Sequence, residues 1–183
     1  MKKNDLRKVL RSKLNAQKAG SRRSRSLRIA KKLLRSGFFR KAHCVCFYVS
    51  TPTEVDTRFL IRRSLDLGKR VLLPRVKPGT RTLELFEIKS QALDLKKGSF
   101  GIFEPPANRC RRASFKEAEL VVVPGLAFDR IKTRLGRGLG FYDRFLKRLP
   151  RKTKKIGLAF AFQNVPEILE EAHDEKVDLV LTD

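Results

Sequence analysis

Cysteine, histidine and long apolar runs are scarce in this sequence, and their scarcity excludes several classes of protein. The 183 residues include three cysteines, two histidines and no tryptophan. Cys44 and Cys46 lie two residues apart in an apolar run, as buried free thiols on one face of a strand would, and a metal site would need a second cysteine pair or clustered histidines. No apolar run comes near the roughly 18 residues that a membrane span needs, and no secretory leader is recognisable. We therefore expect a soluble, cytoplasmic protein without a disulfide framework.

Acidic residues are also scarce, since 19 aspartates and glutamates stand against 43 lysines and arginines, and the net charge is +24. A surplus of this size attracts polyanions, so nucleic-acid binding is one open interpretation and a generally basic proteome is another. Asp5 is the only acid among roughly the first forty residues, and the Arg- and Ser-rich run from Ser21 to Arg28 is also typical of an organelle transit peptide. The acids gather at the other end of the chain, at Glu167, Glu170, Glu171, Asp174, Glu175, Asp178 and Asp183.

The apolar pattern predicts a single domain over residues 1–183 with an α/β fold, a three-layer α/β/α sandwich around a mostly parallel, mixed central sheet. A chain of this length with 41% apolar residues can bury about 70% of its unfolded surface in one core. Two basic helices are expected within residues 3–36, the second with Ser21 as its N-cap. The other expected elements are strands at 43–49, 70–73 (ended by Pro74), 83–88, 120–123, 155–161 and 177–181, and helices at 57–67, 141–149 and 166–172. Because ligands sit at the carboxyl ends of parallel strands, the loops 49–54 and 125–142 should share one rim.

The stretch RLGRGLGFYD, Arg134–Asp143, is the part of the sequence most specific for a ligand. Its three alternating glycines let backbone N–H groups approach an anion, and a helix beginning behind them adds unpaired N–H groups and a favourable dipole. Arg134 and Arg137 add positive charge, and Asp143 supplies a carboxylate of the kind that binds Mg²⁺ beside a nucleotide. The spacing matches neither the P-loop nor the dinucleotide-binding fingerprint. From the residues alone, a nucleoside triphosphate site and a tight glycine turn both remain open.

Longer segments of the chain resemble a known family. VVPGLAFDRIKTRLGRGLGFYDRFL, from Val122 to Leu146, resembles the signature of the 5-formyltetrahydrofolate cyclo-ligases, also called methenyltetrahydrofolate synthetases. The similarity continues in the same order through KNDLR (3–7), YVSTPTEVDT (48–57), GKRVLLPRV (68–76), GSFGIFEP (98–105) and HDEKVDLVLTD (173–183). The sequence departs from the family at Phe141, where a tyrosine is usual, and at Lys132, where a glycine is usual, so this turn either does not need a positive φ or tolerates a strained residue. Since residues 3–7 are part of the resemblance, we expect the basic start of the chain to be retained and not cleaved.

The resemblance implies an activity and a set of site residues. The implied reaction converts 5-formyltetrahydrofolate and ATP, with Mg²⁺, to 5,10-methenyltetrahydrofolate, ADP and phosphate through phosphorylation of the formyl oxygen. Arg137 and Tyr142 are implied as catalytic, Val49 and Glu54 as contacts of the folate, with or without a polyglutamate tail, and Asp143 and Asp178 as Mg²⁺ ligands. The implied ATP contacts are Lys3, Arg7, Arg134, Leu135, Gly136, Arg137, Gly138, Leu139, Gly140, Phe141 and Tyr142.

The alternative class is a nucleic-acid-binding protein on a related but catalytically retired scaffold. Its basic N-terminal helices would grip phosphates, its binding would weaken steeply with salt, and it would show no turnover. The enzyme interpretation predicts instead an ATP- and Mg²⁺-dependent increase of methenyltetrahydrofolate absorbance. We favour the enzyme, acting as a monomer, and expect Arg137→Ala or Asp143→Ala to lower turnover far more than thermal stability.

Overall fold

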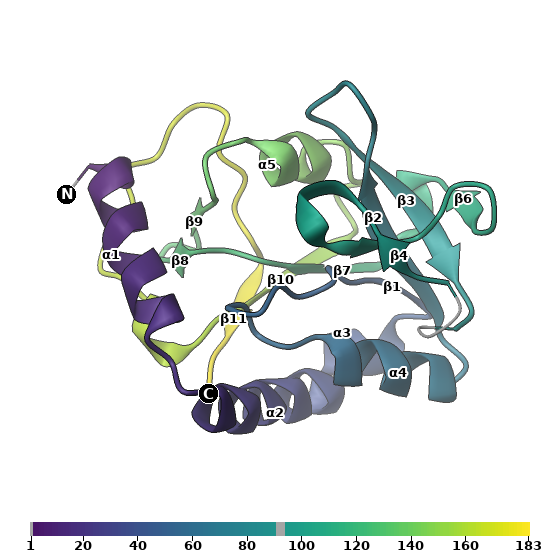
Figure 1. Cartoon of the computed structure of the whole chain (residues 1–183), viewed down its shortest axis with the longest axis horizontal. Helices are drawn as coiled ribbons and strands as arrows, with labels where there is room; N and C mark the ends of the chain where they lie inside the picture. Colours follow the sequence, from purple (N-terminus) through teal and green to yellow (C-terminus); the bar gives the residue numbers. More distant parts are fainter. Residues whose placement is uncertain (1, 91–93) are drawn as a thin grey trace.

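The computed structural model describes residues 2–90 and 94–183, which form a central sheet with helices on both faces (Figure 1). In spatial order the seven strands of this sheet are β11 (Leu179–Leu181), β10 (Lys154–Leu158), β7 (Leu120–Val123), β1 (Cys44–Cys46), β2 (Arg70–Val76), β3 (Leu83–Ile88) and β6 (Arg111–Ala113). The strands from β11 to β2 pair in parallel, and β3 and β6 add antiparallel pairs at one edge. The predicted α/β fold with a mostly parallel, mixed sheet is confirmed.

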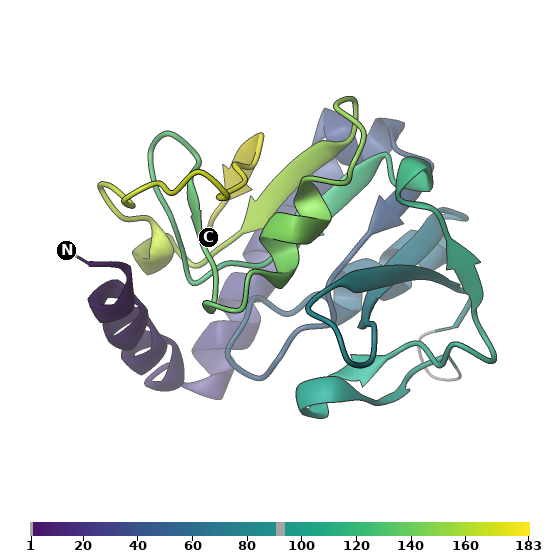
Figure 2. The same cartoon turned by 90° about the horizontal axis from the view of Figure 1, so that it is seen from above.

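Helices form the outer layers of the fold. One face of the sheet is covered by α2 (Ala19–Arg35), α3 (Gly37–Lys41) and α4 (Arg58–Asp66), the opposite face carries α5 (Phe141–Leu146), and α1 (Lys3–Asn15) stands at one end (Figures 1 and 2). The remaining elements are two small hairpins, β4 (Lys96–Lys97) with β5 (Phe103–Glu104) and β8 (Ala127–Phe128) with β9 (Arg134–Leu135), and three 3-10 turns, η1 (Ser99–Gly101), η2 (Phe115–Glu117) and η3 (Ala161–Gln163). None of the helices in the described part of the chain combines the length and the apolar composition needed to cross a membrane.

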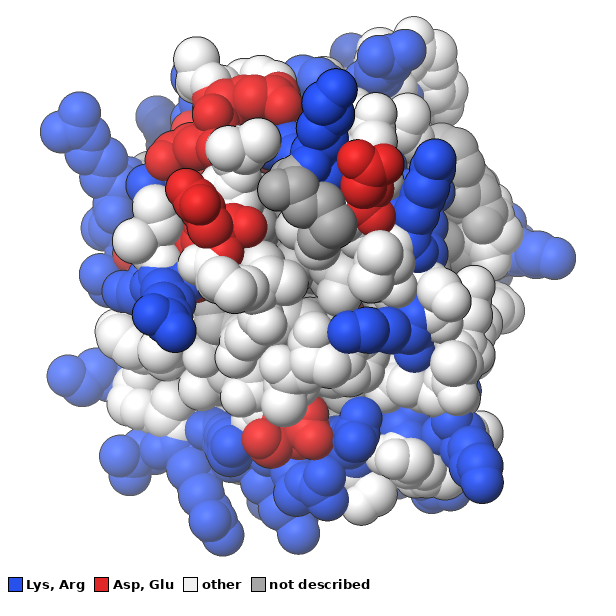
Figure 3. Space-filling view, turned by 90° about the vertical axis from the view of Figure 1, so that its left-hand side faces the viewer, with Lys and Arg blue, Asp and Glu red and all other residues white. Residues whose placement is uncertain are grey.

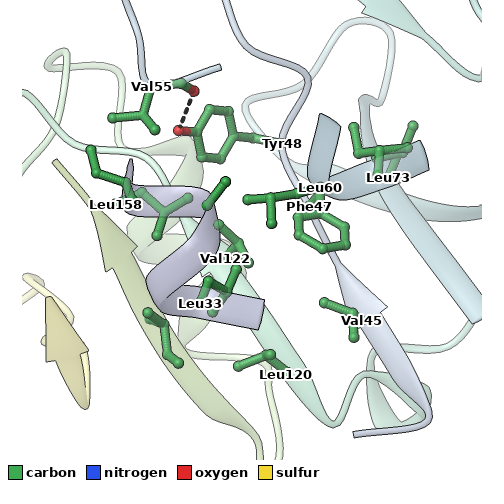
Figure 4. Close-up of a cluster of buried hydrophobic side chains, with 14 of the residues drawn as sticks. Leu33, Val45, Phe47, Tyr48, Val55, Leu60, Leu73, Leu120, Val122 and Leu158 are labelled. Carbon is green, nitrogen blue, oxygen red and sulfur yellow. Dashed lines mark hydrogen bonds between the residues drawn. The ribbon is translucent and has the colours of Figure 1, made fainter. Parts of the chain in front are cut away.

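The core follows from the apolar spacing of these elements. Every residue of β7 is buried, as expected for a parallel strand that is covered on both faces. Figure 4 shows Leu33 of α2 and Leu60 of α4 among side chains of the sheet, and the Tyr48 hydroxyl donates to the Val55 carbonyl at 2.8 Å. A second apolar cluster on the other face holds α5 against the sheet.

All three cysteines are free and buried, as predicted for Cys44 and Cys46, and Cys110 is the third. Burial raises the pKa of the Cys44 thiol to about 11, and burial also raises that of Cys46. Both thiols therefore stay protonated at neutral pH and behave as small apolar side chains.

The acidic end of the chain packs on the basic beginning. The Lys3 ammonium lies 2.6 Å from Asp174 and 3.0 Å from Glu171, and Arg25 and Arg28 lie 3.4 and 3.3 Å from Asp183. On the face on the α1 side, most of the acidic groups lie in the upper part with basic groups beside them, and the lower edge is mostly lysine and arginine around one acidic group (Figure 3). The basic residues near the start of the chain therefore form ion pairs with acidic residues near its end.

Three of the predicted helices differ from those in the structure. The second helix begins at Ala19, so Ser21 lies inside it and caps nothing. The helix that follows the glycines ends at Leu146, before the expected 149, in a short turn. No helix forms at 166–172, because this segment bonds to other parts of the chain, with the Ile168 N–H donating to Asp129 Oδ2 at 3.1 Å. Such tertiary contacts override a weak local helix preference.

Pro74 does not end its strand, since β2 continues through it to Val76. The Leu72 carbonyl accepts a bond from the Phe47 N–H at the end of β1. Two residues later Pro74 faces the same side, where β1 has already ended. The missing N–H of proline therefore costs no hydrogen bond of the sheet at this position.

Lys132 adopts a strained backbone conformation. The turn therefore needs a positive φ and tolerates a strained residue there, which is the second of the two interpretations given above. Lys132 lies in the loop between β8 and β9 with a φ of +68°, and in the described residues it is the only non-glycine with a positive φ. The loop is pinned by the Asp129 carboxylate, which accepts from the Thr133 N–H at 2.8 Å and the Ile131 N–H at 3.1 Å. These bonds hold Lys132 in the left-handed region.

We expect Lys132→Gly to stabilise the protein by about 0.5–1 kcal/mol, because glycine removes the left-handed cost of about 1–2 kcal/mol but adds backbone entropy to the unfolded state. For a chain of this size the melting temperature should rise by about 1–4 °C in a thermal scan. Lys132→Ala is the control, since it removes the side chain and keeps the strain. An equal rise in both variants would show that the side chain, and not its φ, destabilises the turn.

Candidate active site

A cavity of about 370 Å³ opens at the carboxyl ends of the parallel strands. Its walls come from the loop 49–54 after β1 and from the loop 124–143 after β7, so the prediction that these two loops share one rim is confirmed. The third wall is mostly apolar and comes from β2, β3 and the β4–β5 hairpin. Its apolar residues are Pro74, Val76, Leu83, Ile102 and Phe103, and Glu104 is its charged residue. The volume lies within the range of ordinary ligand pockets.

Most of the predicted site residues line this cavity. Those that do are Val49, Glu54, Arg134, Gly136, Arg137, Leu139, Gly140, Phe141, Tyr142 and Asp143. Leu135 is buried in the β8–β9 hairpin and Gly138 is exposed beside α1, so these two belong to the same loop without lining the cavity. Lys3, Arg7 and Asp178 lie outside it.

The glycine loop needs its glycines at two positions in particular. Gly138 has a φ of +104° and Gly140 a φ of +66°, which side chains other than glycine rarely adopt. Gly140 is also the N-cap of α5, and a Cβ there would lie 2.9 Å from Arg144 Nη1. The loop therefore combines unusual backbone conformations with close approach of guanidinium groups.

Arg134 and Asp143 form a buried ion pair at the base of the cavity. Arg134 Nη2 donates to Asp143 Oδ1 at 2.5 Å, and their side chains are 3% and 14% exposed. The guanidinium also lies 5.7 Å from the Tyr142 ring centre. Arg134 Nε is buried and has no hydrogen-bond partner among the described residues. A buried donor without a partner is usually satisfied by an ordered water or a ligand.

Arg137 connects the two functional loops across the cavity. Its Nη2 donates to Glu54 Oε1 at 3.0 Å and to Thr51 Oγ1 at 3.3 Å. The other carboxylate oxygen of Glu54 accepts from the Thr51 N–H at 2.9 Å. The residue implied to contact ATP and the residue implied to contact folate are therefore direct neighbours.

Tyr142 is a phenol that stays protonated. Burial raises its pKa well above the ordinary value, and the nearby Cys46 and Glu54 add to the effect. Its ring packs edge-on against Phe145, with ring centres 5.8 Å apart. At neutral pH this group can donate a hydrogen bond but cannot act as a base.

Helix α1 supports the glycine loop from outside the cavity. Arg7 Nε donates to the Gly136 carbonyl at 3.0 Å, and Arg11 Nη2 donates to the Arg137 carbonyl at 3.1 Å. The sequence analysis missed Arg11, although its four-residue spacing from Arg7 places both on one helix face. Lys3 lies one turn earlier and forms ion pairs with Asp174 and Glu171. Burial lowers the pKa of Lys3, but its hydrogen bonds to these two carboxylates outweigh burial and raise the pKa above the ordinary value.

The two predicted Mg²⁺ ligands are not brought together. Asp178 is exposed just before β11, and its Oδ2 accepts from the Lys155 N–H at 2.7 Å. This is the amino end of a parallel strand and hence the rim opposite the cavity, where Asp143 lies. Within residues 2–90 and 94–183 no group of three acidic, histidine or cysteine side chains could hold a metal. Of the two predicted ligands, the cavity therefore holds only Asp143, while the carboxylates of Glu54 and Glu104 that also line it bond to other groups of its wall. A single carboxylate suits Mg²⁺ where phosphates and water complete its ligands.

Comparison with known proteins points to one family. A model of the 5-formyltetrahydrofolate cyclo-ligase family matches residues 1–183. The chain is 31% identical to the probable 5-formyltetrahydrofolate cyclo-ligase of Schizosaccharomyces pombe, covering 100% of this chain and 95% of that protein. It is also 31% identical to the 5-formyltetrahydrofolate cyclo-ligase of Mus musculus, covering 98% and 92%. The NMR structure of Aquifex aeolicus 5,10-methenyltetrahydrofolate synthetase superposes with a TM-score of 0.87 at 34% identity, covering 100% of this chain and 90% of that one.

Proposed function

The chain belongs to the 5-formyltetrahydrofolate cyclo-ligase family, and on that premise we propose that its cavity binds 5-formyltetrahydrofolate and ATP side by side. The products are 5,10-methenyltetrahydrofolate, ADP and phosphate. The observation that carries this proposal is the contact between Arg137 and Glu54, because the reaction requires a phosphate group and a pterin within one small cavity. The nucleic-acid-binding alternative does not account for that contact.

The chemistry requires the chain mainly to position two substrates and to neutralise charge. The formyl oxygen attacks the γ-phosphorus of ATP as the bond to ADP breaks, and the N10 amine then attacks the activated formyl carbon. The new C–N bond closes the five-membered ring, phosphate leaves with the former formyl oxygen, and N10 gives up its proton. In this scheme Arg137 and the buried Arg134 stabilise the transferred phosphoryl group.

The other residues of the cavity hold the folate and exclude water. The Glu54 carboxylate accepts hydrogen bonds from the N–H groups of the pterin, and Val49 packs against it. Tyr142 donates from its protonated phenol to an oxygen of the reacting groups. No covalent protein nucleophile is needed, and the raised pKa values of Cys44 and Cys46 keep these two thiols unreactive.

Asp143 is the side chain that would hold Mg²⁺, with phosphate and water oxygens as the other ligands. The ion would supply positive charge at the phosphates. Arg7 and Arg11 are positioning residues, because they bond to carbonyl groups of the glycine loop and hold that loop in place. Residues 1–183 function as one cyclo-ligase domain in the cytoplasm, as a monomer, because a net charge of +24 opposes self-association.

A near-ultraviolet absorbance assay on the purified protein tests the proposed function. We expect methenyltetrahydrofolate to accumulate only when 5-formyltetrahydrofolate, ATP and Mg²⁺ are all present, with one ADP released for each ring closed. A protein that shows no turnover, but binds an oligonucleotide with an affinity that falls steeply with salt, would contradict it.

A further inference from the structure

The basic helices that stand out in the sequence lie apart from the cavity. None of the described residues that line it belongs to α2, α3 or α4. These helices cover one face of the sheet, whereas α5 lies on the other face and the cavity opens at the carboxyl ends of the strands (Figures 1 and 2). The exposed side chains of α2, α3 and α4, which we call the helical face, are therefore not used by the proposed reaction.

The helical face carries many cations and almost no acids. Asp66 is the only acid in its three helices. Along the lower edge of Figure 3, where α2 lies, lysines and arginines predominate. The exposed cations of this face whose side chains form neither an ion pair nor a hydrogen bond with any described residue are Arg23, Lys31, Arg35, Arg40, Lys41, Arg62 and Arg63. A surface of this charge attracts polyanions.

Arginines next to the helical face and at the edge of the sheet do have acidic partners. Arg111 of β6 forms ion pairs with two glutamates, and so does Arg70 of β2. On the side of α2 that lies next to β11, Arg25 and Arg28 are both close to Asp183. The helical face differs from these regions because acids are missing from it, so its charge is available to a ligand.

Three exposed apolar side chains lie among these cations. Leu27, Phe38 and Phe59 are 38%, 42% and 43% exposed. Leu27 precedes Lys31 by four residues, so the two share one side of α2. The ring centre of Phe38 lies 6.0 Å from Lys154 Nζ, so this ring also has a cation beside it. Aromatic rings among cations are typical of surfaces that bind single-stranded nucleic acid, because cations contact the phosphates while bases stack on the rings.

Two other polyanionic partners fit this face less well. A helix that binds a membrane surface turns a wide apolar side to the lipid, but the apolar sides of α2 and α4 face the sheet, where Leu33 and Leu60 are fully buried. A nucleic-acid duplex keeps its bases inside the stack, so it would leave Phe38 and Phe59 without a partner. An unpaired strand offers both phosphates and bases, and unpaired bases are common in RNA.

We propose that the helical face binds single-stranded RNA. Its lysines and arginines contact phosphates, while Phe38 and Phe59 stack on bases without selecting a sequence. Arg23 and Arg35 lie about 18 Å apart along the axis of α2, a length that several nucleotides of one strand can follow. This interaction gives a role to the basic helices that the cyclisation reaction does not need, and RNA and the substrates of the cavity bind at the same time.

Fluorescence anisotropy with a labelled single-stranded RNA of about twelve nucleotides tests the proposal. For the wild-type protein we expect a Kd that rises steeply with salt and is lower than the Kd for the RNA duplex of the same sequence, although the duplex has the higher charge density. Phe38→Ala/Phe59→Ala should raise the Kd about tenfold or more, because the bases lose their stacking partners. Phe38→Tyr/Phe59→Tyr keeps both rings and should retain binding. Wild-type affinity in the alanine variant, or equal affinity for the duplex, would overturn the proposal.

Charge variants locate the binding surface. Arg62→Gln/Arg63→Gln removes two cations of the helical face and should raise the Kd several-fold, with a shallower dependence on salt. Lys147→Gln/Arg148→Gln is the matched control, because it removes two adjacent exposed cations just after α5, on the opposite face of the sheet. An equal loss of affinity in this control would mean that net charge, and not the helical face, attracts the RNA.

Activity and vesicle binding complete the test. The kcat and KM of the cyclisation reaction should not change when RNA saturates the helical face, because none of the described residues that line the cavity belongs to α2, α3 or α4. Inhibition by RNA that competes with ATP would place the RNA in the cavity and overturn the proposal. Binding to phosphatidylserine vesicles without binding to RNA would overturn it too. RNA binding is measured without substrates, so its outcome is independent of the proposed catalysis.

Discussion

Replacing Arg137 by alanine is expected to lower kcat by about a hundred- to a thousandfold, the usual effect of removing one donor to a developing negative charge. The melting temperature should change little. The Arg137 side chain is 47% exposed, and its bonds to Glu54 and Thr51 are of the solvent-exposed kind that stabilises a fold by less than about 1 kcal/mol. Steady-state kinetics and a thermal scan on the same preparation measure both quantities.

Two further variants make the Arg137 result specific. Arg130→Ala removes another exposed arginine, located in the neighbouring β8–β9 loop outside the cavity, and should leave kcat within about twofold of wild type. Arg137→Lys keeps the charge but not the fork of donors, so it should recover only part of the activity. If Arg130→Ala were as inactive as Arg137→Ala, net charge would be responsible and the assigned role of Arg137 would be wrong.

The parts of the fold that were predictable are those in which local pattern and tertiary environment agree. The run 120–123 has four consecutive apolar residues, three of them β-branched, and it forms a fully buried central strand. The failures occur where another segment decides. Pro74 can continue its strand because β1 ends before it and leaves no hydrogen bond for the missing N–H of proline to break. Ile168 is not helical because its N–H donates to Asp129. Neither partner can be read from the sequence around these residues.

The candidate site was predictable to the same extent. Residue types and glycine spacing pointed to the loop 134–143, and parallel strand order placed the loop 49–54 beside it. The individual bonds were not predictable, because they join residues far apart in the chain. The Arg137–Glu54 pair and the Arg11 contact with the Arg137 carbonyl depend on side-chain directions that only the folded chain fixes. Asp178 was placed near Asp143 on family resemblance, and the direction of β11 puts it on the opposite rim.

For Asp143 the structure changes the expected result. Asp143→Ala should lower activity, but it should also destabilise the fold by about 3–5 kcal/mol, because it leaves the buried Arg134 guanidinium without its counter-charge. For a chain of this size the melting temperature would then fall by about 6–20 °C. Loss of turnover in this single variant therefore cannot distinguish a metal ligand from a partner of Arg134.

The double variant Arg134→Met/Asp143→Leu separates the two roles. Replacing both members of a buried ion pair by apolar groups of similar volume is often neutral or stabilising, so the melting temperature should return to within a few degrees of wild type. Turnover should stay abolished, since the cavity would then lack its buried cation and its one carboxylate suited to Mg²⁺. Asp143→Asn adds a third point, because its amide oxygen still accepts from Arg134 while the charge is gone. Stability that falls equally in the single and double variants would show that the ion pair is not what Asp143 contributes to the fold.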